Sequence, residues 1–352
     1  MEILIDIRKI RNNISVIQDM CLGAGIQTVW VTKGCHSHSD IIRVLGEMNG
    51  EILGDVYPSN LKRIAGSFPG QTMMINFPAP YQANESVMYA DIIMISSSEH
   101  AEMLSVAAGA LNKKQRVLLM VDVGNLREGI MCRNVKKTVQ KILSFPGINL
   151  VGLGTSVGCY GGYVAGAEDM LRLVKIARDV ETEAGYKFQI LSAGSGTILL
   201  DMVRAGTLPR DINQLRIGAA FLVGEKPPNK EPIFPLCQDC FVFRGTITEL
   251  SQKPSLPAAQ TGVDAFGKKV FFKDMGERTK ALLNFGVIDV DPYDLTPTTP
   301  GINIIGATSN YTLCDVSHCN ANLSVGTCLE FRMGYSAMAR AMASRYVRKT
   351  VL

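Results

Sequence analysis

Residues 29–33 read Val29-Trp30-Val31-Thr32-Lys33, an apolar run that ends in a lysine and is followed at once by a glycine. The run predicts a buried β-strand, where a terminal lysine is unusual because moving an ammonium group out of water is costly. A desolvated lysine can lose its proton and attack carbonyl carbons, which is Schiff-base chemistry. The alternative is a lysine whose stem packs on the strand end while its amine reaches water.

Seven more apolar runs follow the first, and helix-like stretches such as Ser39–Met48 and Ala167–Ala184 lie between several of them. Continuous apolar runs are typical of parallel strands that are buried on both faces. Eight strands alternating with helices over about 200 residues predict an α/β fold, a closed (β/α)8 TIM-type barrel. An open doubly wound sheet competes with it, but no Gly-x-Gly-x-x-Gly turn follows the first strand. The predicted strands are Thr28–Lys33, Glu51–Gly54, Met73–Phe77, Ile92–Ser96, Val117–Gly124, Leu150–Val157, Phe188–Ala193 and Leu215–Val223.

The pattern changes after Gly224, where residues 225–235 are rich in proline and charge and predict a linker. We therefore expect a barrel at 1–224 and a C-terminal β-rich domain at 236–352, with residues 1–8 forming a strand that can pair with the second domain. Residues 336–347 predict a short helix or a coil. The strand candidates of the second domain are Phe241–Thr248, Lys268–Phe272, Ala281–Ile288, Ile302–Ala307, Tyr311–Val316 and Thr327–Met333.

Composition limits the classes of function. The chain has 352 residues, of which 47% are hydrophobic, and a formal net charge of +4. No run of like charges occurs and only one tryptophan, so no nucleic-acid partner is predicted. No apolar stretch reaches membrane-spanning length and the N-terminus lacks the apolar core of a signal peptide, so we expect a cytoplasmic protein with no membrane partner.

Nine cysteines are scattered along the chain, and in a reducing compartment we expect most to be buried small hydrophobes. Cys237 and Cys240 have the spacing of metal ligands, but no second pair completes a four-ligand site with them. Cys314, His318 and Cys319 form the other cluster. We predict no metal site at either.

The predicted carboxyl ends of the strands carry polar, glycine-rich segments, and in a barrel this end carries the chemistry. Lys33 follows the first strand, Arg127 the fifth, and Arg216 lies in the eighth. Glycines and small hydroxyls after the seventh and eighth strands predict a phosphate cradle. A lysine amine, a phosphate cradle and two arginines together suit pyridoxal 5'-phosphate, which needs a lysine Schiff base and a held phosphate.

The chain resembles the fold-type III pyridoxal phosphate enzymes, and within them the alanine/ornithine racemase family, over nearly its whole length. The segments that carry this resemblance are Val31-Thr32-Lys33, Val121–Gly129, Cys159-Tyr160-Gly161-Gly162 and Ile212–Gly218, with Asp289-Val290-Asp291 and Tyr335–Tyr346 in the second domain. Together they are far more specific than any single motif.

The resemblance implies roles for individual residues. Lys33 would hold the cofactor covalently and act as one acid/base, and Arg127 would lie near the cofactor's phenolic oxygen or the substrate carboxylate. Arg216 would face the pyridine nitrogen and, being always protonated, discourage protonation of that nitrogen. The resemblance also implies a homodimer in which the second domain of one subunit completes the site of the other. The residues that would bind the cofactor phosphate are Ser195, Thr197, Gly218, Ala219 and Tyr335.

Two departures from the family pattern bear on mechanism. Val287 stands where alanine racemases carry the tyrosine that is the second acid/base, a gap that ornithine-racemase-like relatives share. Because two-base racemisation needs a group on each face of the α-carbon, we expect Tyr311 to supply it, with Asp289 and Cys314 as further candidates. Ser156 stands in place of a histidine that stacks on the cofactor ring, and Tyr160 is close in sequence.

The resemblance implies an amino-acid racemase with ornithine as the first substrate to test. A basic side chain would need a carboxylate or carbonyl partner, which the sequence does not single out. The alternatives are a racemase for alanine, lysine or another amino acid, a decarboxylase on the same scaffold, and a non-catalytic pyridoxal phosphate carrier. A cofactor-free racemase with two cysteines as opposed bases would leave Lys33 without a role.

Overall fold

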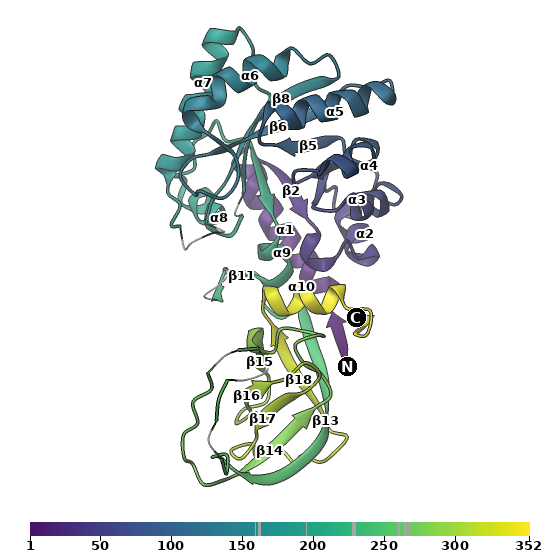
Figure 1. Ribbon diagram of the computed structural model, residues 1–352, viewed down its shortest axis with the longest axis vertical. Coiled ribbons are helices and arrows are strands. Elements are labelled where there is room, and N and C mark those ends of the chain that lie inside the picture. Colours follow the sequence, from purple (N-terminus) through teal and green to yellow (C-terminus); the bar gives the residue numbers. More distant parts are fainter. Residues whose placement is uncertain are drawn as a thin grey trace. The chain divides into compact units, whose positions relative to one another are not determined.

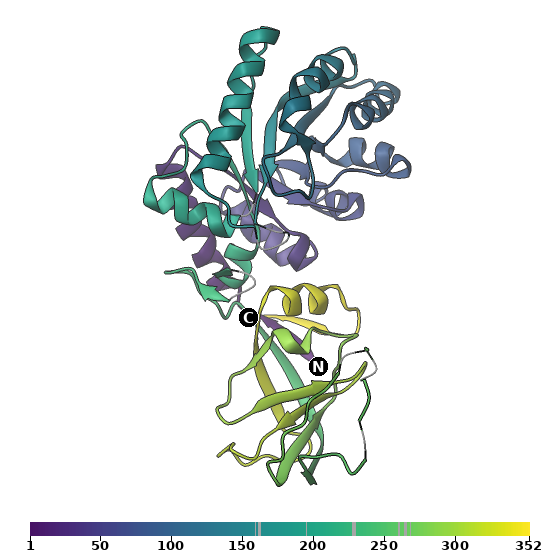
Figure 2. The same ribbon diagram turned by 60° about the vertical axis from the view of Figure 1, so that its left-hand side comes forward.

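The computed structural model describes residues 1–158, 160, 163–194, 196–226, 230–259, 261–263, 266–267 and 269–352. The chain divides into two compact units. One unit is Arg8–Cys237, and the other joins Met1–Ile7 to Gln238–Leu352. In Figures 1 and 2, helices and strands alternate in the first unit, whereas strands dominate the second.

The first unit is a closed barrel of eight parallel strands in the order β5-β4-β3-β2-β10-β9-β8-β6, and pairing of β5 with β6 closes it. All eight predicted strands are present, so the predicted (β/α)8 barrel is confirmed. The short β7 (Ile130–Met131) pairs with the end of β6. The barrel strands are β2 (Gln27–Val31), β3 (Ile52–Asp55), β4 (Gln71–Met74), β5 (Ile92–Ile95), β6 (Gln115–Asp122), β8 (Ile148–Ser156), β9 (Ile190–Gly194) and β10 (Gln214–Ile217).

Helices surround the strands (Figure 1), and apolar side chains from the strands, among them Val29, Met94 and Leu118, fill the barrel interior. The predicted strand Leu215–Val223 is too long, since β10 ends at Ile217 and residues 219–223 form a helix. The prediction failed there because a short apolar run is compatible with either a strand or a helix. The helices are α1 (Ile7–Gly23), α2 (Ser39–Glu47), α3 (Pro58–Ala65), α4 (Ala83–Tyr89), α5 (Ser98–Ala110), α6 (Val135–Leu143), α7 (Ala167–Ala184), α8 (Gly196–Ala205) and α9 (Ala219–Val223).

The second unit is built on a twisted sheet with the path β15-β18-β13-β14-β17-β16. The first strand of the chain, β1, pairs antiparallel with β13 and parallel with β19, the last strand. Phe285 packs edge-on against Phe243 and Phe331 in the core, with ring centroids 4.8 and 5.7 Å apart. The elements are β1 (Glu2–Ile5), β13 (Phe241–Pro254), β14 (Glu277–Leu283), β15 (Leu295–Pro297), β16 (Asn303–Ala307), β17 (Thr312–Asp315), β18 (Cys328–Met333), α10 (Tyr335–Ala343) and β19 (Arg348–Val351).

Two predictions for the second half are wrong. Residues 269–272, the described part of the predicted strand Lys268–Phe272, make only an isolated bridge from Lys269 to Val263. Phe271 and Phe272 are exposed there, and a strand needs a face that is covered. The predicted linker at 225–235 contains a small hairpin of β11 (Glu225–Lys226) and β12 (Glu231–Pro232) and belongs to the first unit. No helix among the described residues is long and apolar enough to cross a membrane.

Candidate active site

Lys33 lies just beyond the carboxyl end of β2, as the first residue of the 3-10 turn η1 (Lys33–Cys35). Its side chain is exposed, which differs from the desolvated lysine that the apolar run predicts. The strand ends at Val31, and Thr32 rather than Lys33 takes the buried position that follows. The amine is therefore available at the barrel end.

A single buried carboxylate holds the Lys33 turn. Asp55, the last residue of β3, is fully buried, and its Oδ2 accepts hydrogen bonds from Thr32 Oγ1 and Ser37 Oγ, both at 2.8 Å. Its Oδ1 accepts from the Val56 amide at 2.7 Å and from Asn60 Nδ2 at 2.9 Å. Thr32 and Ser37 flank η1, so both ends of the Lys33 turn are tied to the neighbouring strand.

Arg216 of β10 crosses the same end of the barrel. It is 6% exposed, and its guanidinium donates to Ser192 Oγ and the Thr155 carbonyl, both at 2.6 Å, and to Ser156 Oγ at 3.1 Å. Ser156, Gly194 and Arg216 are aligned in register across β8, β9 and β10, and β2 is the next strand. A Cβ on Gly194 would lie 2.6 Å from Arg216 Nη2, so the glycine leaves room for the guanidinium.

The loop after β6 carries Arg127 and Glu128. Asp122 Oδ1 caps the loop by accepting from the amides of Gly124 at 2.8 Å and Leu126 at 3.1 Å. Gly129 has a φ of 111°, and a Cβ there would lie 2.6 Å from the Asp122 amide nitrogen. The loop is therefore closed tightly on the strand end, and Arg127 forms a two-pronged ion pair with its neighbour Glu128.

Glu128 is half-buried, and the sequence interpretation did not single it out. Burial raises the pKa of its carboxyl group, but the hydrogen bond and charge of Arg127, a hydrogen bond with Ser156 and the charge of Arg216 outweigh burial and lower the pKa below its usual range. Glu128 therefore lies within electrostatic reach of the Arg216 row and is ionised at neutral pH. Only its place inside the family-like segment 121–129 could have drawn attention to it.

The loops after β9 and β10 form a close-packed corner that suits a phosphate. Thr197 lies in the first turn of α8 and is buried, and a helix N-terminus presents free backbone N–H groups to an anion. A Cβ on Gly196 would lie 2.9 Å from the Ile217 Cα, and one on Gly218 would lie 3.3 Å from the Val31 Cβ. Ala219 begins α9 beside them. Ser195, the remaining predicted phosphate ligand of the barrel, lies outside the described residues.

Two further polar groups are buried at this end without a hydrogen-bond partner among the described residues. They are the amide of Asn125, in the loop after β6, and the hydroxyl of Thr155, near the end of β8. Buried polar groups are nearly always satisfied, so unpaired ones indicate a missing ligand or water. A phosphorylated aromatic aldehyde such as pyridoxal phosphate fits this end of the barrel. The features that suit it are a lysine, the arginines, unpaired buried polar groups and a helix start lined by glycines.

The second-unit candidates lie in two adjoining turns. The Val287 amide donates to the Thr308 carbonyl at 3.0 Å and the Ile288 amide to the Ser309 carbonyl at 3.1 Å. Tyr311, 41% exposed, follows in the second of these turns. The structure thus brings the turn that contains Tyr311 beside the turn that contains Val287, the position of the missing tyrosine. Tyr335, half-buried, starts α10, whose Arg340 donates to the Val287 carbonyl at 3.3 Å.

The other second-base candidates have structural roles. Asp289 is 4% exposed and accepts the Gly286 amide at 3.1 Å, as a turn carboxylate does. Cys314 is fully buried in β17, and burial raises the pKa of its thiol to about 12. Cys35, two residues from Lys33, is fully buried too, and burial raises the pKa of its thiol to about 12. Neither thiol is available as a thiolate base at neutral pH.

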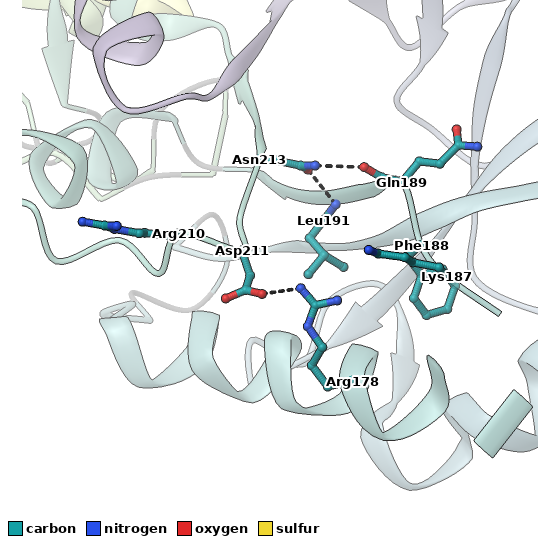
Figure 3. A pocket seen from close by; sticks show the side chains of 8 residues that line it. All are labelled: Arg178, Lys187, Phe188, Gln189, Leu191, Arg210, Asp211 and Asn213. Atoms are coloured by element: carbon teal, nitrogen blue, oxygen red, sulfur yellow. Dashed lines mark hydrogen bonds and ion pairs between the residues drawn. The ribbon is translucent and has the colours of Figure 1, made fainter. Parts of the chain in front are cut away.

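A separate pocket of about 720 Å³ lies at the amino-terminal ends of β9 and β10. Asn213 donates to the Gln189 carbonyl at 2.8 Å and accepts from the Leu191 amide at 2.9 Å, and Asp211 pairs with Arg178. Figure 3 marks these contacts with dashed lines. Lys33 and Arg127 follow the opposite, carboxyl ends of their strands. The pocket is therefore not part of the candidate active site.

The protein is an α/β-barrel enzyme of the fold-type III kind. This class is defined by the barrel, the lysine at the end of a strand and the second, β-rich unit. The chain belongs to the alanine racemase family, whose N-terminal domain model matches residues 5–227. It is 34% identical over 352 residues to a protein named ornithine racemase from Acetoanaerobium sticklandii, covering 100% of this chain and 99% of the relative. It is 32% identical over 348 residues to one named lysine racemase from Thermotoga maritima, covering 99% and 97%.

Solved structures share the fold. One is alanine racemase from Bartonella henselae with covalently bound pyridoxal phosphate. The TM-score is 0.74 at 13% identity, covering 100% of this chain and 99% of that one. The resemblance to the alanine racemase family inferred from the sequence motifs is confirmed.

Proposed function

We propose that this protein is a pyridoxal phosphate-dependent amino-acid racemase, an isomerase that interconverts L- and D-amino acids, with ornithine as its first substrate. The observation that carries the proposal is that Lys33, just beyond β2, and Arg216, within the neighbouring strand β10, both lie toward the carboxyl end of the barrel. Full-length similarity to proteins named ornithine racemase and lysine racemase supports a basic amino acid as substrate.

When bound, pyridoxal phosphate supplies an electron sink that acidifies the α-proton of the attached amino acid. Lys33 would hold the cofactor and move the proton on one face of the α-carbon. Thr197, Gly218 and Ala219 would hold the phosphate at the two loop ends, together with Ser195 and with Tyr335 of the second unit. Arg127 would orient the substrate carboxylate or the cofactor's phenolic oxygen through its donor-only guanidinium.

Arg216 has a different task. Its bonds to Ser192, Thr155 and Ser156 fix the guanidinium, which stays protonated at any working pH. Facing the ring nitrogen, it would offer only donors, so that nitrogen would stay unprotonated. Electron density would then remain near the α-carbon, which favours return of a proton there over other reactions.

Racemisation needs a second acid/base, and we propose Tyr311. Val287 has no titratable group, Asp289 is committed to a turn and Cys314 is buried in a strand. Tyr311 and Tyr335 belong to the second unit, and we propose that a homodimer places this unit of one subunit at the barrel of its partner. Exposed Ile288 and Tyr311 in the adjoining turns support a surface that another copy covers.

The test incubates the pyridoxal phosphate-loaded protein in D2O with L-ornithine, L-lysine and L-alanine separately. Chiral chromatography follows the D-isomer, NMR follows the α-proton, and a Lys33→Ala variant is the control. We expect D-ornithine with deuterium at the α-carbon from the wild type and nothing from the variant. Release of carbon dioxide without a D-isomer would identify a decarboxylase, and no exchange with any amino acid would contradict a racemase.

A further inference from the structure

We infer that Glu128 is the side chain that selects substrates with a cationic side chain, by accepting a hydrogen bond from the terminal ammonium group of ornithine or lysine. The inference rests on the proposed function and names the residue that sets its substrate class.

The carboxyl end of the barrel carries positive charge. Arg127, after β6, and Arg216, within β10, bring two permanent positive charges to the carboxyl end of the barrel. A substrate that adds a further ammonium group would be repelled unless an anion receives it, because isolated charges are costly to desolvate. A carboxylate near the end of the substrate side chain would receive this ammonium group and offset its charge.

Two other carboxylates near the strand ends are already used. Asp55 accepts hydrogen bonds from Thr32, Ser37, Val56 and Asn60, so each of its two carboxylate oxygens already accepts two. Asp122 caps its own loop through two amides. Among the described residues, the Glu128 carboxylate accepts from the Arg127 side chain and caps no backbone amide of its loop.

The hydrogen-bonding capacity of Glu128 leaves room for a ligand. An ionised carboxylate offers about four lone-pair positions, and a two-pronged arginine uses one on each oxygen. Ser156 is close enough to help lower the pKa of the Glu128 carboxyl group. The remaining lone-pair positions can accept an ammonium proton without breaking the pair with Arg127.

The exposure of the Glu128 side chain also suits ligand binding. The Glu128 side chain is 19% exposed, so a ligand can reach the carboxylate while the surrounding protein limits screening by water. Its position is fixed, because Gly129 packs against the Asp122 backbone and Arg127 holds both oxygens. A fixed anion discriminates between side chains better than a mobile one, because it loses less entropy on binding.

The competing role for Glu128 is to position Arg127 alone, and substrate comparison separates the two. Norleucine has the length of ornithine but ends in a methyl group in place of the ammonium. If Glu128 binds the ammonium group, removing the charge of Glu128 lowers kcat/KM for ornithine but not for norleucine. If it only positions Arg127, both amino acids are affected alike.

The experiment compares wild type and Glu128→Gln in the loaded enzyme. For ornithine and lysine, kcat/KM should fall about 10- to 100-fold, the range for a lost charge-assisted hydrogen bond. For norleucine, kcat/KM, or its inhibition constant against ornithine if turnover is too slow, should hold or improve. Equilibrium absorbance titration of each amino acid gives a dissociation constant as a readout independent of turnover.

Glu47→Gln is the matched control, because Glu47 is likewise a glutamate paired with arginine, here Arg11 and Arg43, but on the outer helices α1 and α2. It should leave every value unchanged. Equal losses for ornithine and norleucine in Glu128→Gln, or no loss for either, would overturn the inference while the racemase proposal stands. A wild type that racemises no basic amino acid would overturn the proposed function and the inference with it.

Discussion

Thr32 Oγ1 donates a 2.8 Å hydrogen bond to the buried carboxylate of Asp55, and Thr32 is the residue immediately before Lys33. The turn that follows contains His36 and Ser37 with φ angles of 53° and 48°, in the left-handed region that non-glycine residues rarely occupy. Such backbone persists only where surrounding contacts hold it. The direction in which Lys33 leaves β2 therefore depends on one carboxylate of the neighbouring strand.

Replacing Thr32 with valine should disturb this arrangement. The loss of a buried donor leaves Asp55 short of a partner, so we expect the free energy of unfolding to fall by about 1–3 kcal/mol. Lys33 should bind pyridoxal phosphate more slowly, as followed by absorbance. Thr182→Val, which removes an exposed hydroxyl from α7, is the control and should load normally. Unchanged loading by Thr32→Val would show that Asp55 does not orient Lys33.

Gly194→Ala should displace Arg216. Its Cβ would lie 2.6 Å from Arg216 Nη2, and the guanidinium cannot move away without breaking bonds to Ser192, Thr155 and Ser156. We expect racemase activity to fall at least about 10-fold, since fixed electrostatic groups contribute that much or more. Gly109→Ala in α5, where nothing lies within 4 Å, should leave activity unchanged. Full activity in Gly194→Ala would mean that Arg216 is not needed where it lies.

Tyr311→Phe tests the second acid/base. A positioned general acid or base contributes about 10²- to 10⁴-fold, so formation of D-ornithine should fall by that range. Exchange of the α-proton should persist for one enantiomer, because Lys33 still serves one face. NMR in D2O and chiral chromatography separate the two readouts. Tyr293→Phe, another exposed tyrosine of the second unit, is the control, and racemisation at the wild-type rate by Tyr311→Phe would refute the assignment.

Cys35 should be chemically inert despite its closeness to Lys33 in sequence. Burial raises the pKa of its thiol to about 12, and the thiolate is the reactive form, so alkylation by iodoacetamide at pH 8 should miss it in the native protein. Mass spectrometry of the digest checks this, with exposed Cys328 as the internal positive control. Cys35→Ala should keep activity within about threefold, since no thiolate base is involved. Loss of proton exchange in this variant would revive a two-cysteine mechanism.

The second unit should lose stability in acid through Asp315. Burial raises the pKa of this carboxyl, but hydrogen bonds from Ser317 and the pair with Arg278 at 2.8 Å outweigh it and lower the pKa. The stabilisation is therefore present above the usual aspartate range and is lost as pH falls through the lowered value. Arg278→Met should cost about 3–5 kcal/mol at pH 7, because it leaves an unpaired buried charge. The cost should shrink in acid, and a pH-independent cost in denaturant titrations would contradict this account.

Apolar patterning was sufficient to predict the barrel because each strand is covered on both faces, which produces runs such as Ile92–Ile95 that little else in a chain resembles. It failed at residues 219–223, where five apolar residues form a helix rather than the end of a strand. The strand β10 ends at Ile217, and the backbone turns at Gly218 before the helix α9 begins. No periodicity in so short a run records that turn.

The site was predictable only in part. Lys33 and Arg216 are conspicuous as charged residues in apolar strands, whereas Asp55 and Glu128 become meaningful only when neighbouring strands bring them to partners distant in sequence. Asp55, at the end of β3, binds Thr32, just after β2, and Glu128, in the loop after β6, comes near Ser156 at the end of β8. Pairing across a barrel is set by the register of strands, which a single sequence does not state.

The placement of β1 between β13 and β19 has a consequence for synthesis on the ribosome. β1 pairs with Phe241–Arg244 and with Arg348–Val351, which lie far along the chain, and the Leu352 amide donates to the Ile5 carbonyl. The barrel is thus inserted between two strands of another sheet, and it can fold while that sheet still lacks its neighbours. β1 therefore completes its pairing only after Arg348–Val351 has been synthesised.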